Sequence, residues 1–158
     1  MADPEAPLLS LIVPIYGVED YVADCLDSIL GAPGFFEYCE LVIVDDGSPD
    51  GSMAIAERHC AGLNNVTVVR QANAGLGAAR NTGLAHARGR YVWFIDSDDE
   101  ICRDAIEVLA ACMDRFSPDV VAFEFETIGG TLQRGSYLDV YDRPVNPIDF
   151  LMSGRPPS

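Results

Sequence analysis

Residues 41–48 read Leu-Val-Ile-Val-Asp-Asp-Gly-Ser, an apolar run that ends abruptly in two aspartates and a turn. Four consecutive apolar residues without polar alternation are typical of a strand buried on both faces, as in a parallel sheet. The same arrangement returns at Tyr91–Ile95, which runs into Asp96-Ser97-Asp98-Asp99, and a third apolar run spans Leu8–Ile15. Buried strands that end in polar loops predict an α/β sheet with its functional residues at the strand ends.

Helical patterns separate these strands along the 158 residues. Apolar residues repeat at helical spacing through Val18–Leu30, and Ser48-Pro49 predicts the N-cap and first position of a second helix that runs to His59. Before the strand Tyr91–Ile95, the sequence predicts a strand at Val66–Val69 and a helix at Gly75–Ala87. After it, the sequence predicts a helix at Arg103–Phe116 and a strand at Val120–Phe125. This βαβαβαβαβ order predicts an open, mostly parallel, Rossmann-like sheet with helices on both faces. We expect residues 8–138 to form one domain and residues 139–158 to be an extended or truncated segment of a longer protein.

The chain is strongly acidic, with 25 Asp and Glu against 10 basic residues, all arginine, and a net charge of -15. A field of this sign repels nucleic acids and anionic lipids, so neither is an expected partner. A phosphate-bearing ligand would need a local cluster of donors, a helix N-terminus or a metal ion.

No apolar run approaches the roughly 20 residues of a membrane span, and the acidic N-terminus does not resemble a secretory signal, so we expect a cytoplasmic location, at most peripheral to the inner membrane face. Five scattered cysteines without a CxxC pair predict reduced thiols.

Asp96 and Asp98 are the strongest candidate metal ligands. If the strand stays extended, both side chains point to one side and Ser97 points away. Two carboxylates this close repel each other unless a cation or proton lies between them, and carboxylate oxygens suit Mg2+ or Mn2+. A metal would let an acidic protein hold a diphosphate. The alternative is that Asp98 or Asp99 only caps the following helix.

Two further positions are candidates for ligand contact. Asp45 and Asp46 are adjacent, so one can face a cleft while the other orients the loop, and the facing carboxylate could accept from a base N–H or a ribose hydroxyl. An ordinary acidic turn is the alternative. Arg80 follows the glycines of Gly75-Leu76-Gly77 and could donate to a phosphate or carboxylate, or form a surface ion pair.

Five motifs in order resemble family 2 glycosyltransferases, namely Leu11–Tyr16, Val42–Ser52 with its Asp-Asp-Gly-Ser, Asn73-Ala-Gly75, Ala79-Arg-Asn-Thr-Gly83 and Phe94–Asp99. The resemblance covers about residues 8–126. It implies the GT-A fold and an inverting enzyme that takes a nucleotide-diphosphate sugar, with a UDP-sugar favoured, and transfers the sugar to a saccharide or lipid-linked acceptor. Synthesis of cell-surface or extracellular polysaccharide is the implied setting.

The resemblance also implies roles for individual residues. Those that would bind the nucleotide-sugar are Pro14, Tyr16, Glu19, Asp46, Arg80, Asp96 and Ser97, with Asp46 reading the base. Asp98, with Asp96, would ligate Mn2+ or Mg2+ on the diphosphate.

Two departures from the family pattern matter. Gly17 stands where the family usually has Asn, which removes one side-chain contact. No acidic motif after Asp99 resembles the family's general base, so the catalytic base is expected outside this chain. The chain is then expected to be a donor-binding part with little activity of its own. A non-catalytic nucleotide-binding module and a Mg2+-dependent phosphohydrolase are the alternatives, although the latter would want a downstream lysine that the chain lacks.

Overall fold

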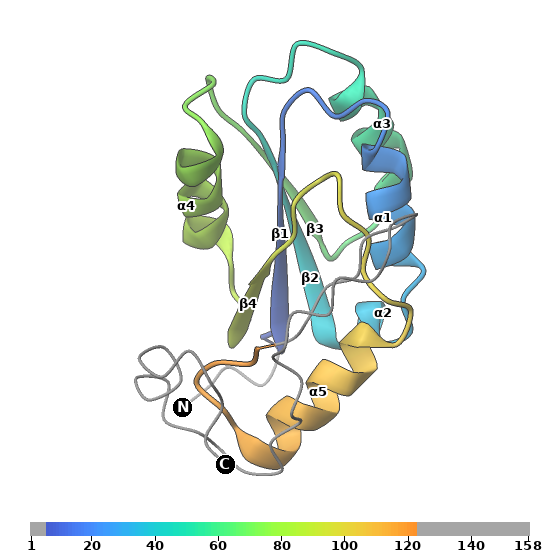
Figure 1. The fold of residues 1–158 in the computed structure, drawn as a ribbon, viewed down its shortest axis with the longest axis vertical. Coiled ribbons are helices and arrows are strands. Elements are labelled where there is room, and N and C mark those ends of the chain that lie inside the picture. The colour runs from blue at the N-terminus through green and yellow to red at the C-terminus, as the bar shows by residue number, and fades with distance from the viewer. Residues whose placement is uncertain (1–5, 123–158) are drawn as a thin grey trace, which may run out of the picture. The chain divides into compact units, whose positions relative to one another are not determined.

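A four-stranded parallel sheet forms the centre of the fold in a computed structural model that describes residues 6–122. The strands lie in the order β3-β2-β1-β4, and each neighbouring pair is parallel (Figure 1). Their bounds are β1 Leu9–Ile15, β2 Cys39–Asp45, β3 Val66–Arg70 and β4 Tyr91–Phe94. The predicted parallel α/β sheet is confirmed.

Helices cover both faces of this sheet, as predicted (Figure 1). The helices are α1 Val22–Leu30, α2 Phe35–Tyr38, α3 Ser52–His59, α4 Leu76–His86 and α5 Ala105–Phe116. α1 and α3 lie together on one face, and α4 packs against β1 and β2 on the other. Right-handed crossovers explain this division, because the chain moves from β1 to β2 to β3 in one direction and returns through α4 to β4 in the other.

The two central strands are the most buried elements. Every residue of β1 is buried, and so is every residue of β2 except Asp45 at its end. Against α4 the buried cluster contains Ile12, Val42, Val44 and Ala79. Continuous burial on both faces accounts for the absence of alternation in these sequences.

Several elements differ from those predicted. α3 begins at Ser52, because the Ser48 hydroxyl accepts from the Gly17 amide and donates to Asp50 instead of capping a helix. β2 begins at Cys39, two residues early, and the short helix α2 was not predicted. Of the predicted strand Val120–Phe125, residues 120–122 are not in a strand, and the rest lies outside the described residues, as does the expected boundary at 138.

A buried carboxylate ties the amino-terminal edge of the sheet together. Glu40 accepts from the Ser10 hydroxyl at 2.6 Å, from Arg88 Nε at 2.8 Å and from the Gly89 amide at 3.2 Å. Burial raises the pKa of Glu40, but hydrogen bonds from Ser10 and Arg88 and the Arg88 charge outweigh it and leave that pKa below its ordinary value. This cluster fixes the start of β4 beside β1.

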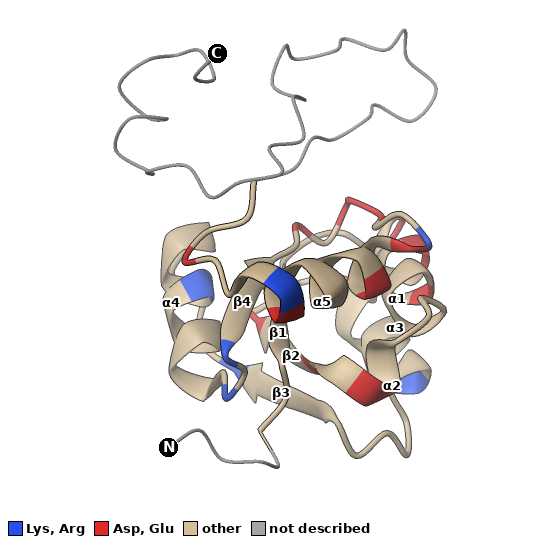
Figure 2. Cartoon of the chain, turned by 90° about the horizontal axis from the view of Figure 1, so that it is seen from below, with Lys and Arg blue, Asp and Glu red and all other residues tan. Residues whose placement is uncertain are grey.

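Acidic residues outnumber basic residues in the chain, 25 to 10. In Figure 2 the arginines of the described residues (blue) lie on several elements, α4 and α5 among them. Within residues 6–122, no helix has the length and apolarity needed to cross a bilayer.

Candidate functional site

A cavity of about 480 Å³ opens at the carboxyl ends of the strands. Its walls come from the ends of β1, β2 and β4 and from the start of α4, and its lining residues are Pro14, Ile15, Tyr16, Asp46, Asn73, Gly75, Leu76, Ala79, Asp96, Ser97 and Asp98. Strand order reverses between β1 and β4, and open α/β sheets bind ligands at such a switch point. The volume is within the range of small-molecule sites.

Asp46 is the most enclosed acidic group of the cavity, at 3% exposure. One carboxylate oxygen, Oδ1, accepts from Gln71 Nε2 at 2.7 Å and from the Ala74 amide at 2.9 Å, and the other, Oδ2, accepts from the Gly75 amide at 2.9 Å. Burial raises the pKa of Asp46, but these three hydrogen bonds outweigh it and lower that pKa overall. Asp46 is therefore held as a carboxylate facing the cavity.

Asp45 has the second role expected of this pair. Its Oδ1 accepts from the Ser48 amide at 2.9 Å, and its Oδ2 lies 3.8 Å from Arg70 Nε. This carboxylate orients the turn and does not line the cavity.

Asp96, Ser97 and Asp98 all line the cavity, but not through the extended geometry that the sequence suggested. β4 ends at Phe94, and the Asp99 amide donates to the Asp96 carbonyl at 3.0 Å, which closes a turn. Ser97 is buried and lines the cavity as well, and because the strand ends at Phe94, the extended geometry on which its predicted orientation depended is not present. The turn, rather than a pleated strand, brings both carboxylates to one cavity.

Arg80 joins α4 to this turn. Its Nη2 donates to Asp96 Oδ1 at 2.5 Å, while its buried Nε has no hydrogen-bond partner within residues 6–122. The guanidinium thus offsets one of the two carboxylates, although Arg80 itself is not among the residues that line the cavity. It donates to a carboxylate of the site itself, so the ion pair is part of the site.

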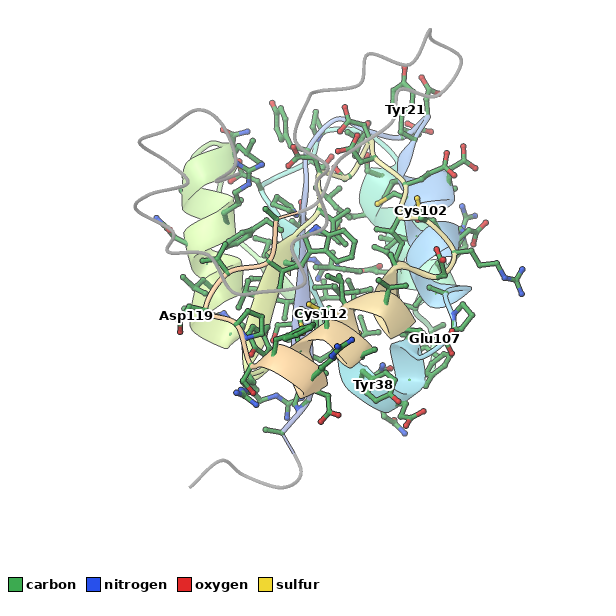
Figure 3. The ribbon with its side chains drawn as sticks, turned by 60° about the horizontal axis from the view of Figure 1, so that its bottom comes forward. Tyr21, Tyr38, Cys102, Glu107, Cys112 and Asp119 are labelled. Atoms are coloured by element: carbon green, nitrogen blue, oxygen red, sulfur yellow. The ribbon has the colours of Figure 1, made fainter. Side chains whose placement is uncertain are left out.

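Helix α1 supports the turn from beneath. Ser28 Oγ accepts from the Ile101 amide at 3.0 Å and donates to the Cys25 carbonyl at 2.7 Å. The Cys25 thiol lies 3.8 Å from the Asp96 carbonyl, and burial, followed by the nearby acidic groups, raises the pKa of that thiol to about 12. The cysteines are all free, as expected, although Cys102 is exposed in the loop before α5 (Figure 3).

Glu19 is not among the residues that line the cavity. Its Oε2 accepts from the Gly51 amide at 2.9 Å, and its own amide donates to Asp50. Asp50 also accepts from the hydroxyls of Ser48 and Ser52, and these bonds lower its pKa. The loop after β1 is thereby joined to the loop before α3, while the nucleotide contact of Glu19 stays a prediction.

Oxygen donors for a divalent ion are present at the turn. Asp98 is exposed, lines the cavity and has no hydrogen-bond partner within the described part of the chain. Burial and the charges of Asp98 and Asp96 raise the pKa of Asp99, which indicates a local excess of negative charge. No three Asp, Glu, His or Cys side chains gather as a metal cage in residues 6–122. Two carboxylates fit Mg2+ or Mn2+ when phosphate and water complete the coordination.

Sequence reasoning missed several members of the site. Leu76 and Ala79 line the cavity from α4, where apolar helix positions carry no functional signal. Asn73 was quoted in a motif without a role, and Gln71 was not singled out at all. The position of Gln71, directly after β3 at the carboxyl edge, could have identified it.

Comparison with known proteins finds glycosyltransferases among the relatives of this chain. Across 119 residues the chain is 39% identical to the uncharacterized glycosyltransferase EpsJ of Bacillus subtilis (strain 168). The matched residues make up 75% of this chain and 34% of EpsJ. The chain thus spans about a third of the length of this relative.

Solved structures agree with the fold. The crystal structure of S. aureus TarS 1-349 superposes with a TM-score of 0.73 at 34% identity, and the match covers 78% of this chain and 37% of that 1-349 chain. TarS 1-349 has also been solved with UDP and with UDP-GlcNAc. Each of these structures matches 70% of this chain at a TM-score of 0.66 and 35% identity, and the matches cover 33% and 32% of the two TarS 1-349 chains. The mannosyltransferase PcManGT from Pyrobaculum calidifontis, solved with GDP-Man and Mn2+, gives 0.58 at 30% identity over 70% of this chain and 32% of its own. The model of the family described as "Glycosyl transferase family 2" matches residues 10–151, and the chain therefore belongs to this family.

Proposed function

We propose that this chain is the donor-binding part of a metal-assisted, inverting glycosyltransferase that uses a nucleotide-diphosphate sugar, with a UDP-sugar favoured. The observation that carries the proposal is the cavity at the switch point, where Asp46 lies at one side and the Asp96–Asp98 turn at the other. A base-reading carboxylate and a phosphate-side carboxylate pair in one cavity match the two ends of such a donor.

Asp46 would bind the base. Oδ1 already has two hydrogen-bond donors, whereas Oδ2 has one, so one acceptor direction remains for a ring N–H. Pro14 and Tyr16 line the same cavity and would contact the nucleoside. The bound UDP of the TarS structure supports a uridine nucleotide, and the GDP-Man of PcManGT makes GDP the next candidate.

Asp98, together with Asp96, would hold Mn2+ or Mg2+ against the diphosphate. When bound, such an ion supplies neutralisation of the negative charge that develops on the leaving diphosphate. Arg80 would add a second positive charge near the sugar and phosphates, through the guanidinium that donates to Asp96. The metal ion and Arg80 would thus supply local positive charge for the diphosphate in a chain whose net charge is -15.

The acceptor substrate and the general base are proposed for the whole protein. We place the base, a carboxylate, outside this chain, where it would take the proton of an acceptor hydroxyl as that oxygen attacks the anomeric carbon from the side opposite the diphosphate. A saccharide or lipid-linked acceptor, polysaccharide synthesis and a cytoplasmic site at the inner membrane face complete the proposal.

Nucleotide-dependent thermal stability tests the donor site. UDP, GDP, TDP and, as a negative comparison, NAD are each added with and without Mn2+. At about 100 times its dissociation constant, one nucleoside diphosphate should stabilise the wild type by about 2.7 kcal/mol, and only with the metal. Asp98→Ala should abolish this shift, whereas Asp24→Ala, which removes an exposed α1 carboxylate away from the cavity, should keep it.

Two results would contradict the proposal. A shift that is equal with and without Mn2+ and survives Asp98→Ala would remove the metal role. Rapid transfer of sugar to a simple acceptor by this chain alone would show that the base lies within it.

A further inference from the structure

Behind Asp46 lies a line of polar groups that the donor site itself does not use. Thr82 of α4 donates through Oγ1 to Gln71 Oε1 at 2.5 Å, and Gln71 Nε2 donates to Asp46 Oδ1 at 2.7 Å. Neither Thr82 nor Gln71 lines the cavity. Both groups are half-buried, in the region where α4 packs on the sheet.

The direction of each hydrogen bond is determined by chemistry. A carboxylate can only accept, so Asp46 requires the amide nitrogen of Gln71 to face it. The amide oxygen of Gln71 must then face Thr82, whose hydroxyl becomes the donor. Because a hydroxyl can donate or accept, Asp46 selects the amide orientation, and Thr82 anchors the Gln71 side chain in that orientation.

This arrangement also fixes what Asp46 offers to a ligand. Oδ1 is satisfied by Gln71 and the Ala74 amide, and the Gly75 amide takes one lone pair of Oδ2. The remaining lone pair of Oδ2 can accept from a base but cannot donate to one. Donors around a carboxylate also favour its ionised form, which agrees with the lowered pKa of Asp46.

We propose that Thr82 and Gln71 are positioning residues that hold Asp46 as an oriented, ionised acceptor and thereby set the preference of the site for a base with a ring N–H. The inference rests on the proposed function, since it concerns the same donor site. Uracil carries an N–H at N3, whereas cytosine has a lone pair there. Without the Gln71 donor, Asp46 can turn or take up a proton, and the distinction between the two bases weakens.

The test compares the dissociation constants of UDP and CDP in the presence of Mn2+, by calorimetric titration of the 158-residue chain. In the wild type, UDP should bind at least about tenfold more tightly than CDP, because cytosine leaves the buried acceptor facing another acceptor. Gln71→Leu keeps much of the side-chain volume without the amide, and should lower the UDP preference about tenfold. Thr82→Val should lower it about two- to fivefold, and Thr82→Ser, which keeps the hydroxyl, should restore it.

Thr67→Val is the matched control, because it makes the same change at an exposed position of β3. It should leave the UDP preference unchanged. The ratio of the two dissociation constants is the informative readout, since a purely structural role would lower the melting temperature without changing that ratio. If Gln71→Leu does not fold, the Thr82 pair gives the same answer.

The outcomes separate this inference from the donor-site proposal. Metal-dependent UDP binding with a ratio that survives both Gln71→Leu and Thr82→Val overturns the positioning role and leaves the donor site standing. A wild type that binds UDP and CDP equally also overturns it. If the wild type binds no nucleoside diphosphate at all, the proposed function and this inference both fall.

Discussion

Gly83 tests whether α4 is held against the sheet by close packing. A Cβ at this position would lie 2.3 Å from Ile12 Cγ2 and 3.2 Å from Val44 Cγ2, and Ile12 is fully buried. Gly83→Ala therefore requires a displacement of about 1 Å in a packed core, which costs about 1–3 kcal/mol. Gly77 on the same helix has nothing within 4 Å of its would-be Cβ.

The comparison of Gly83→Ala with Gly77→Ala isolates this packing cost. Both changes gain up to about 1 kcal/mol of helix propensity, so that gain largely cancels between them. We expect Gly83→Ala to be less stable than Gly77→Ala by about 1–3 kcal/mol. In urea unfolding followed by circular dichroism, a 2 kcal/mol difference with a slope of about 2 kcal/mol/M separates the midpoints by about 1 M. Equal midpoints, or a more stable Gly83→Ala, would refute the packing argument.

Three further changes test other contacts. Glu40→Gln should lower the free energy of unfolding by about 1–3 kcal/mol at pH 7. The folded-state pKa of Glu40 is lowered, so its stabilisation is complete above the ordinary pKa of 4.5 and is lost as pH falls toward the folded value; urea titrations at pH 7 and pH 4 should show that the variant lacks this loss. A thiol reagent at pH 8 should modify Cys102 first, and Cys25 and Cys39 only after unfolding, because both are buried and their pKa values are raised to about 12; mass spectrometry would show the order. Ser28→Ala, which frees the loop after β4, should weaken UDP binding about two- to tenfold in the same calorimetric titration, and unchanged affinity would contradict its supporting role.

The sheet could be predicted because burial on both faces leaves a direct trace in the sequence. β1 and β2 lie between two helical layers, so their residues are apolar throughout and do not alternate. Glu40 shows where this signal ends. A carboxylate inside β2 does not resemble a strand residue, and only the tertiary partners Ser10 and Arg88 make its burial possible.

The site was predictable at the strand ends and less so between them. Asp46, Asp96 and Asp98 end apolar runs, and the parallel topology brings such ends to one edge. Turn geometry is local and context-dependent, which is why the extended geometry expected of residues 96–98 was wrong. Gln71 gave no signal of its own, because its importance lies in the group that it holds and not in its chemistry alone.

The segment 79–83 shows that a family motif combines chemistry with architecture. Ala79 is fully buried and lines the cavity, and Arg80 binds Asp96, which lines it too. Thr82 orients Gln71 from the next turn of the helix, while Gly83 allows that helix to approach Ile12. The side chains that serve the donor site can reach it only because α4 lies this close to the sheet. Substitution of Gly83 should therefore disturb stability before selectivity, and substitution of Thr82 should do the reverse.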